Sequence, residues 1–179
     1  MKIVPLTDEM RYMANGKSDA LGEIRNSIRH GEGNYVGYLG EEAIAAYLGA
    51  NLMSCEDGEA KYSHDLVLLS GEKAEVKTKK RRVPPRDFYK AAVAETSRHQ
   101  RPDVYIFMSY DELRDEMWVV GQKGYMEFYA KARYVPEGSE DASNTWRSPS
   151  AHYAIEHRDL DEVVVRPHQM EMGGIIALA

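Results

Sequence analysis

The change of periodicity after residue 49 constrains the fold more than any other feature of the sequence. Residues 38–48 carry apolar side chains at helical spacing, and Gly49 ends this segment as a C-terminal cap. Short runs typical of β-strands follow at residues 65–69, 74–78, 104–109 and 117–120. A helix followed by paired strands predicts an α/β fold with a mixed central sheet flanked by helices.

Further helices and strands are predicted around this sheet. A helix over about residues 86–99, entered through Pro84-Pro85, separates the two pairs of strands, and another helix is predicted near residues 125–133. Two short strands are predicted after a polar loop, near residues 153–156 and 163–165.

The N-terminal region is predicted to be helical but broken. Asn15-Gly16 interrupts the helical pattern, and Thr7 and Ser18 are suitable N-caps for two separate segments. We therefore expect one compact body with three parts. These are an N-terminal helical segment packed on the core, a main domain and a C-terminal tail, at residues 1–34, 35–170 and 171–179.

Composition excludes several classes of protein. The single cysteine, Cys55, excludes an internal disulfide and a zinc site built from paired thiolates. No apolar run approaches the roughly 18 residues that span a bilayer, so no membrane partner is expected. The N-terminal stretch breaks at Pro5 and turns acidic before a signal-like core forms, and a cytoplasmic location is therefore expected. The formal charge of −6 argues against a protein that is basic over its whole surface.

An acid and an amine lie side by side on one predicted strand. In Ala74-Glu75-Val76-Lys77-Thr78 side chains alternate between faces, so Glu75 and Lys77 share one face. Asp65 opens the preceding strand, and Ser70-Gly71-Glu72-Lys73 is a suitable tight connection between the two. This hairpin brings Asp65 towards Glu75.

Converging carboxylates predict a divalent cation. Asp65 and Glu75 would repel each other unless a cation lay between them, and Mg²⁺ prefers oxygen ligands. A third acid, Glu41, lies at the edge of the apolar stripe of the preceding helix, whereas Glu42 projects to the solvated side. A bound ion could polarise a phosphodiester and activate water, while Lys77 positions that water or offsets charge on the phosphate.

The pattern Glu41, Asp65, Glu75-x-Lys77 resembles the PD-(D/E)XK, or restriction-endonuclease-like, nuclease superfamily. Further segments are similar to a group of phage and metagenomic nuclease-like proteins: Asn26-Ser27-Ile28, Gly31-Glu32-Gly33-Asn34, Gly37-Tyr38-Leu39-Gly40-Glu41 and Glu75-Val76-Lys77-Thr78-Lys79. The resemblance covers roughly residues 20–165 by element order. The proline that the family has before its aspartate is replaced by His64.

The resemblance implies a fold, a reaction and a set of ligands. It implies an α-β-β-β-α-β core, dependence on Mg²⁺ or Mn²⁺, and DNA as substrate. Asp65, Glu75, the main chain of Val76 and Glu41 would then hold the metal, and Lys77 would be the catalytic lysine. An endonuclease is expected, phage-encoded and working in the host cytoplasm; a symmetric dimer would make cutting both strands easiest.

Each feature also has a simpler interpretation. Glu75 and Lys77 could form an ordinary ion pair, Asp65 could be a turn residue, and Glu41 could interact only with the helix dipole. His64 could contact a phosphate or a metal-bound water, and Gln100 could contact a metal ligand or DNA. A catalytically silent DNA-binding or interaction module on the same fold is the alternative function.

A basic run continues out of the active-site strand. Four of its side chains and one that follows are candidates for holding the phosphate backbone: Lys79, Lys80, Arg81, Arg82 and Arg86. The alternative is an ordinary solvated face. The polar loop at residues 136–150, which contains Trp146, could contact a base or simply cover the surface.

Overall fold

A six-stranded mixed sheet forms the centre of the computed structural model, which describes residues 1–21, 33–52, 63–140 and 147–164. Its strand order is β1-β7-β6-β4-β3-β2, and only β4 and β6 are parallel neighbours. The strands are β1 (Lys2–Val4), β2 (Asn51–Leu52), β3 (Leu66–Val67), β4 (Lys73–Arg81), β6 (Val104–Asp111) and β7 (Glu116–Gly124). The long strands β4, β6 and β7 form the rigid middle that carries the candidate site.

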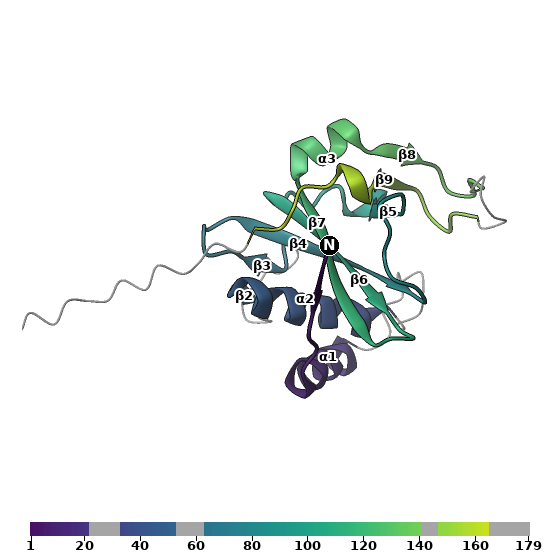
Figure 1. Cartoon of the computed structure of the whole chain (residues 1–179). Coiled ribbons are helices and arrows are strands. Elements are labelled where there is room, and N and C mark those ends of the chain that lie inside the picture. The colour runs from purple at the N-terminus through teal and green to yellow at the C-terminus, as the bar shows by residue number, and fades with distance from the viewer. Residues whose placement is uncertain (22–32, 53–62, 141–146, 165–179) are drawn as a thin grey trace, which may run out of the picture.

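A second, smaller sheet covers one face of the first. It has the order β5-β9-β8, and all its neighbours are antiparallel. The strands are β5 (Lys90–Ala94), β8 (Arg133–Val135) and β9 (His152–Glu156). The helix α3 (Tyr125–Lys131) lies on the same side as this sheet, as Figure 1 shows.

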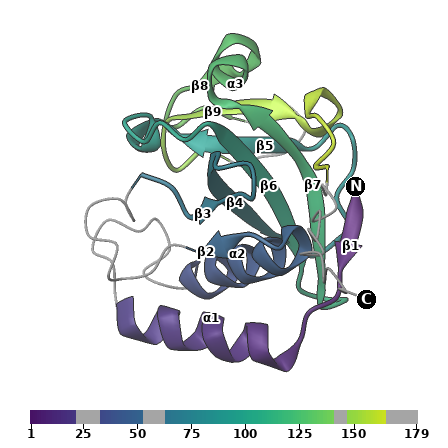
Figure 2. The same cartoon turned by 90° about the vertical axis from the view of Figure 1, so that its left-hand side faces the viewer.

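Two helices cover the opposite face. In Figure 2, α2 (Asn34–Leu48) lies directly against the central sheet, and α1 (Asp8–Leu21) lies outside α2. The molecule is therefore layered as α1, α2, central sheet, and small sheet with α3. Two short 3-10 turns, η2 (Glu95–Ser97) and η3 (His157–Asp159), follow β5 and β9.

Strand alternation divides the core into two halves. On β6, Val104, Ile106 and Met108 pack towards α2, whereas Tyr105 and Phe107 pack towards the small sheet. The α2 side is closed by buried side chains such as Leu39, Ile44 and Leu66, and the other side by Val93, Phe128 and Ile155. Glu75 and Lys77 alternate with Ala74, Val76 and Thr78, so the acid and the amine lie on the face turned away from α2.

The helix α2 approaches the sheet closely at one glycine. A Cβ atom on Gly40 would lie 1.9 Å from Oγ1 of Thr78 on β4. Only a residue without a side chain fits this approach, which brings the helix that carries Glu41 against the strand that carries Glu75 and Lys77.

Most of the predicted elements are confirmed. The helix over residues 38–48 is the main part of α2, and Gly49 caps it in the left-handed conformation, with φ 64°. The predicted runs correspond to β3, β4, β6, β7, α3 and β9, and Thr7 Oγ1 accepts a hydrogen bond from the Met10 N–H at the start of α1. The α/β class with a mixed sheet and flanking helices is thus confirmed.

The helix predicted over residues 86–99 is wrong. This segment contains strand β5 and the turn η2 instead. Its alanines favour a helix locally, but Ala91 and Val93 alternate into the core while β5 pairs along its length with β9. Tertiary pairing has overridden local propensity here.

Two smaller predictions also fail, and short strands were missed. The helix α1 runs through Asn15-Gly16 without a break, and its residue Ala14 is fully buried. Ser18 therefore lies inside a helix and is not an N-cap. No strand forms at Val163 and Val164, and residue 165 lies outside the described residues. The edge strand β1 was not predicted because three residues carry too little periodicity.

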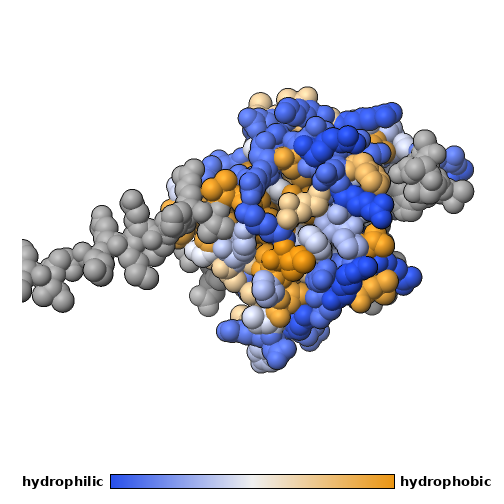
Figure 3. Space-filling model, viewed as in Figure 1, coloured by the Kyte–Doolittle hydropathy of each residue, from blue (hydrophilic) through white to orange (hydrophobic). Residues whose placement is uncertain are grey.

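Some sequence predictions fall outside the described residues. These are the end of the N-terminal segment at residues 22–32, part of the polar loop at residues 141–146 and the tail at residues 171–179. None of the described helices is long and apolar enough to cross a bilayer. On the face drawn in Figure 3, hydrophobic side chains form separate patches between hydrophilic ones.

Candidate active site

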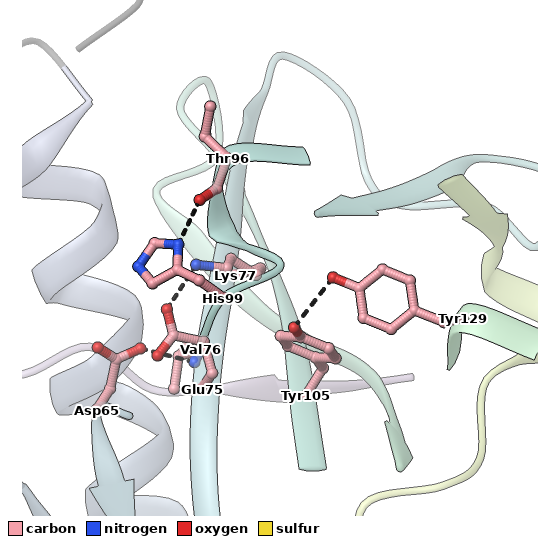
Figure 4. Close-up of polar contacts among 8 residues, drawn as sticks. All are labelled: Asp65, Glu75, Val76, Lys77, Thr96, His99, Tyr105 and Tyr129. Carbon is pink, nitrogen blue, oxygen red and sulfur yellow. Dashed lines mark hydrogen bonds and ion pairs between the residues drawn. The ribbon is translucent and has the colours of Figure 1, made fainter. Parts of the chain in front are cut away.

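Asp65 and Glu75 lie opposite each other on neighbouring strands. Leu66 pairs with Ala74, so Asp65, one residue before β3, lies across from Glu75. The Asp65 N–H donates to the Ala74 carbonyl (3.0 Å), and its Oδ2 accepts a hydrogen bond from the Val76 N–H (2.7 Å). Figure 4 shows the two carboxyl groups side by side. The hairpin expected from the sequence has therefore brought the two acids together.

Lys77 forms an ion pair with Glu75 on the same face of β4. Its Nζ donates to Glu75 Oε1 at 2.6 Å, as Figure 4 shows. The Glu75 side chain is only 5% exposed, whereas that of Lys77 is 26% exposed and reaches solvent. Glu75 Oε2 is buried and accepts no hydrogen bond from the described residues. A buried carboxylate oxygen of this kind is suited to receive a ligand or a cation.

Glu41 completes a cluster of three acids. Burial, and then repulsion by Asp65, raise the pKa of Glu41 to about 8. Burial, and then repulsion by Glu75, raise the pKa of Asp65 to about 7, although the hydrogen bond from Val76 acts in the opposite direction. The acids are thus close enough to oppose one another's ionisation, which a bound cation would relieve.

Lys17 of α1 was not predicted as part of this region. Its Nζ lies 2.9 Å from Oε1 of Glu42, whose side chain is only 13% exposed, so the expectation that Glu42 is simply solvated is wrong. Lys17 also lowers the pKa of Glu41, against the larger effects of burial and Asp65. No sequence pattern predicts this contact, because it depends on how α1 packs on α2.

Tyr105 was also missed. It lies next to Glu75 in the parallel pairing of β4 with β6 and is fully buried. Burial and a hydrogen bond with the Tyr129 hydroxyl (3.4 Å) raise its pKa. Alternation along β6 could place Tyr105 on one face, but only the strand register places it beside Glu75.

The donor atoms fit a hard divalent cation. Asp65 and Glu75 offer carboxylate oxygens, and Glu41 lies near them. The Val76 N–H points to Asp65, and because the N–H and C=O of a strand residue face the same neighbour, the Val76 carbonyl lies on that edge too. Within the described part of the chain, no three side chains of His, Cys, Asp or Glu already converge at ligand distances. A ligand set would need main-chain oxygen or water besides the carboxylates.

The two residues expected behind the site have different environments. His64 is buried, and its Nδ1 lies 2.6 Å from Ser63 Oγ. Gln100 follows η2, and its N–H donates to the Ser97 carbonyl. His64 adjoins Asp65 in the chain, and nothing in the described contacts assigns Gln100 a role.

The basic run is divided between structural contacts and exposed positions. Arg81 is half-buried, with its guanidinium 4.6 Å from the centre of the Tyr89 ring. Lys80 and Arg82 both pair with Glu112, at 2.6 and 2.8 Å. Lys79 and Arg86 are exposed, and Arg86 lies over the Phe88 ring. Alternation places Lys79 on the same face as Glu75 and Lys77, which makes it the member of the run nearest in orientation to the candidate site.

The chain matches no protein-family model and no curated protein.

Proposed function

We propose that the chain is a Mg²⁺- or Mn²⁺-dependent deoxyribonuclease that hydrolyses phosphodiester bonds, acting as an endonuclease. The observation that supports this most is the pairing of Asp65 with Glu75 across a hairpin, with Lys77 held at 2.6 Å from Glu75. Burial, and then repulsion by a neighbouring carboxylate, raise the pKa values of Asp65 and Glu41. Such an arrangement favours a divalent cation over a purely structural role.

Part of the element order supports this proposal, because it follows the order that the resemblance implies. The elements α2, β2, β3 and β4 follow one another, and β6 lies parallel to β4. The connection from β4 to β6 contains β5 and η2 where the resemblance implies a helix. The catalytic part of the core, α2 to β4, does not depend on this connection.

The metal would be held by Asp65, Glu75 and the Val76 carbonyl, with Glu41 contacting it directly or through water. When bound, the ion polarises the phosphodiester and lowers the pKa of a water molecule. The Lys77 side chain is partly exposed, so its ammonium group can move away from Glu75 and donate a hydrogen bond to the phosphate. Its charge stabilises the extra negative charge that develops as water adds to phosphorus and the P–O bond to the leaving strand breaks.

DNA would be held by the basic side chains beyond Lys77. Lys79 shares the face of the candidate site, and Arg86 is exposed at the far end of the run. Lys80 and Arg82 would need to release Glu112 before they could contact phosphate. Arg81 stabilises the fold through Tyr89 and is the least suited of the five.

The test is cleavage of plasmid, linear and branched DNA with Mg²⁺, with Mn²⁺ and with chelator. Wild-type protein should cut only with metal, and Lys77→Ala should lose at least about a hundredfold in rate, as is typical when one charge-stabilising donor is removed. Lys79→Ala is the matched control. It removes the same charge two residues further along the same face of β4, so it should weaken DNA binding and leave the cleavage rate at saturating DNA intact.

One observation favours a second function. Lys77 already pairs with Glu75 at 2.6 Å, as expected for a silent DNA-binding module in which a lysine neutralises this acid. That module would bind DNA in the presence of chelator and cut none of the substrates with either metal.

A further inference from the structure

A pocket of about 700 Å³ opens at the start of β6. It lies where η2 leads into β6 and where α3 follows β7, and its wall includes Arg98, Arg101, Tyr125, Met126 and Tyr129. Its size falls within the roughly 300–1,000 Å³ of small-molecule sites. A cavity of this size accommodates one small planar ligand.

The pocket combines cations with flat and apolar surfaces. Arg98 is held in place because its guanidinium lies 5.3 Å from the centre of the Tyr129 ring and donates a hydrogen bond to the Tyr153 hydroxyl at 3.0 Å. Arg101 is exposed and forms no ion pair with any described residue. Met126 is 76% exposed at the pocket wall. An anion can therefore bind to the arginines while a ring packs on the tyrosine and methionine side chains.

Two carboxylates also line the pocket. Asp103 uses one oxygen to accept a hydrogen bond from the Lys73 N–H, and Glu127 lies at the opening turn of α3. The two acids balance the two arginines, so the pocket does not attract a phosphate backbone by net charge alone. Carboxylates accept hydrogen bonds from the amino groups of bases, and arginines bind phosphate. A nucleotide matches this mixture better than a simple anion does.

One buried side chain, that of Tyr105, lies between the pocket wall and Glu75. Tyr129 forms a hydrogen bond with Tyr105, and the Tyr125 ring is 6.1 Å from the Tyr105 ring, centre to centre. Tyr105 in turn lies beside Glu75 in the register of β4 and β6. Figure 4 shows Tyr105 between Tyr129 and the Glu75-Lys77 pair. A strand whose phosphate lies at Glu75 could therefore place a neighbouring nucleotide in the pocket.

We propose that this pocket binds an unpaired nucleotide of the DNA next to the bond that is cut. Bases in a duplex expose only their edges, whereas a concave site with aromatic walls fits a base that has left the stack. The preferred substrate would then be DNA with a single-stranded tail or flap. This inference rests on the proposed nuclease function for its biological meaning, but the binding itself does not require cleavage.

The experiment compares binding of a blunt duplex with that of the same duplex carrying a single-stranded tail, by fluorescence anisotropy with chelator present. Arg101→Ala and Met126→Ala change exposed side chains and should each weaken binding of the tailed DNA about fivefold or more, the lower end of the loss known for one stacked base. The control is Arg158→Ala. Arg158 is an exposed arginine paired with Glu156 and is not part of the pocket wall.

The outcomes separate the pocket from the nuclease reaction. A selective loss for tailed DNA supports the pocket even if no DNA is cut with Mg²⁺ or Mn²⁺, in which case only the nuclease proposal fails. The pocket assignment is overturned if Arg101→Ala and Arg158→Ala weaken both DNAs equally. It is also overturned if wild-type protein binds the blunt duplex as tightly as the tailed one, whether or not cleavage occurs.

Discussion

Replacing Asp65 with asparagine should make the metal-free protein more stable at high pH. Asparagine keeps an oxygen that can accept the hydrogen bond from Val76 and removes the charge that Glu75 and Glu41 oppose. The pKa of Asp65 is raised from 3.8 to about 7, a shift of about 3 units, which corresponds to about 4 kcal/mol of folding free energy once the carboxyl group is ionised. This is a large share of the stability of a typical domain.

The direction in which stability changes with pH follows from proton binding. An unfolded Asp65 loses its proton near its ordinary pKa, whereas the folded one keeps it until about pH 7, so the folded state holds more protons between these values. Wild-type stability should therefore fall as pH rises through this window, by up to about 1.4 kcal/mol per pH unit for this one group. Asp65→Asn should match wild type near pH 4 and exceed it above pH 7.

The assay is denaturant unfolding across this pH range in the presence of chelator. Asp159→Asn, on the exposed turn η3, is the control for the removal of one surface carboxylate. Addition of Mn²⁺ should restore wild-type stability at high pH and have little effect on Asp65→Asn. A difference in unfolding free energy between Asp65→Asn and wild type that stays constant with pH would contradict this prediction.

Two further substitutions test the fold around the site. Gly40→Ala should lower stability by about 1–3 kcal/mol, because its Cβ would collide with Thr78 Oγ1, and Thr78→Ala should recover most of the loss in thermal unfolding. Asp161→Ala should cost about 3 kcal/mol in denaturant unfolding, because Lys123, with a side chain only 4% exposed, would lose its partner at 3.0 Å. Equal melting temperatures of Gly40→Ala and wild type, or an unchanged unfolding midpoint for Asp161→Ala, would contradict these contacts.

The sequence predicted the parts of the site that depend on local pattern. Alternation placed Glu75 and Lys77 on one face, and a short hairpin connection brought Asp65 opposite Glu75. Helical periodicity and the cap at Gly49 located α2, which carries Glu41. These features depend on a few consecutive residues and on backbone geometry that any strand or helix shares.

The features of the fold and of the candidate site that were not predicted depend on packing between segments that are distant in the sequence. A helix was predicted where β5 lies because alanine favours helices, and only the pairing with β9 makes this segment a strand. Lys17 and Tyr105 reach the acids through the packing of α1 on α2 and the register of β4 with β6. Likewise, the contact of Arg81 with Tyr89 could not be read from a run of basic residues.

The central claim is that Asp65 and Glu75 share one divalent cation. The most direct measurement is anomalous diffraction from a crystal soaked in Mn²⁺ at a pH above 8, where both Asp65 and Glu41 are ionised. A single Mn²⁺ is expected about 2 Å from oxygens of Asp65 and Glu75, with Glu41 or its water nearby. No anomalous peak at these side chains, or a Mn²⁺ bound only elsewhere on the chain, would contradict it.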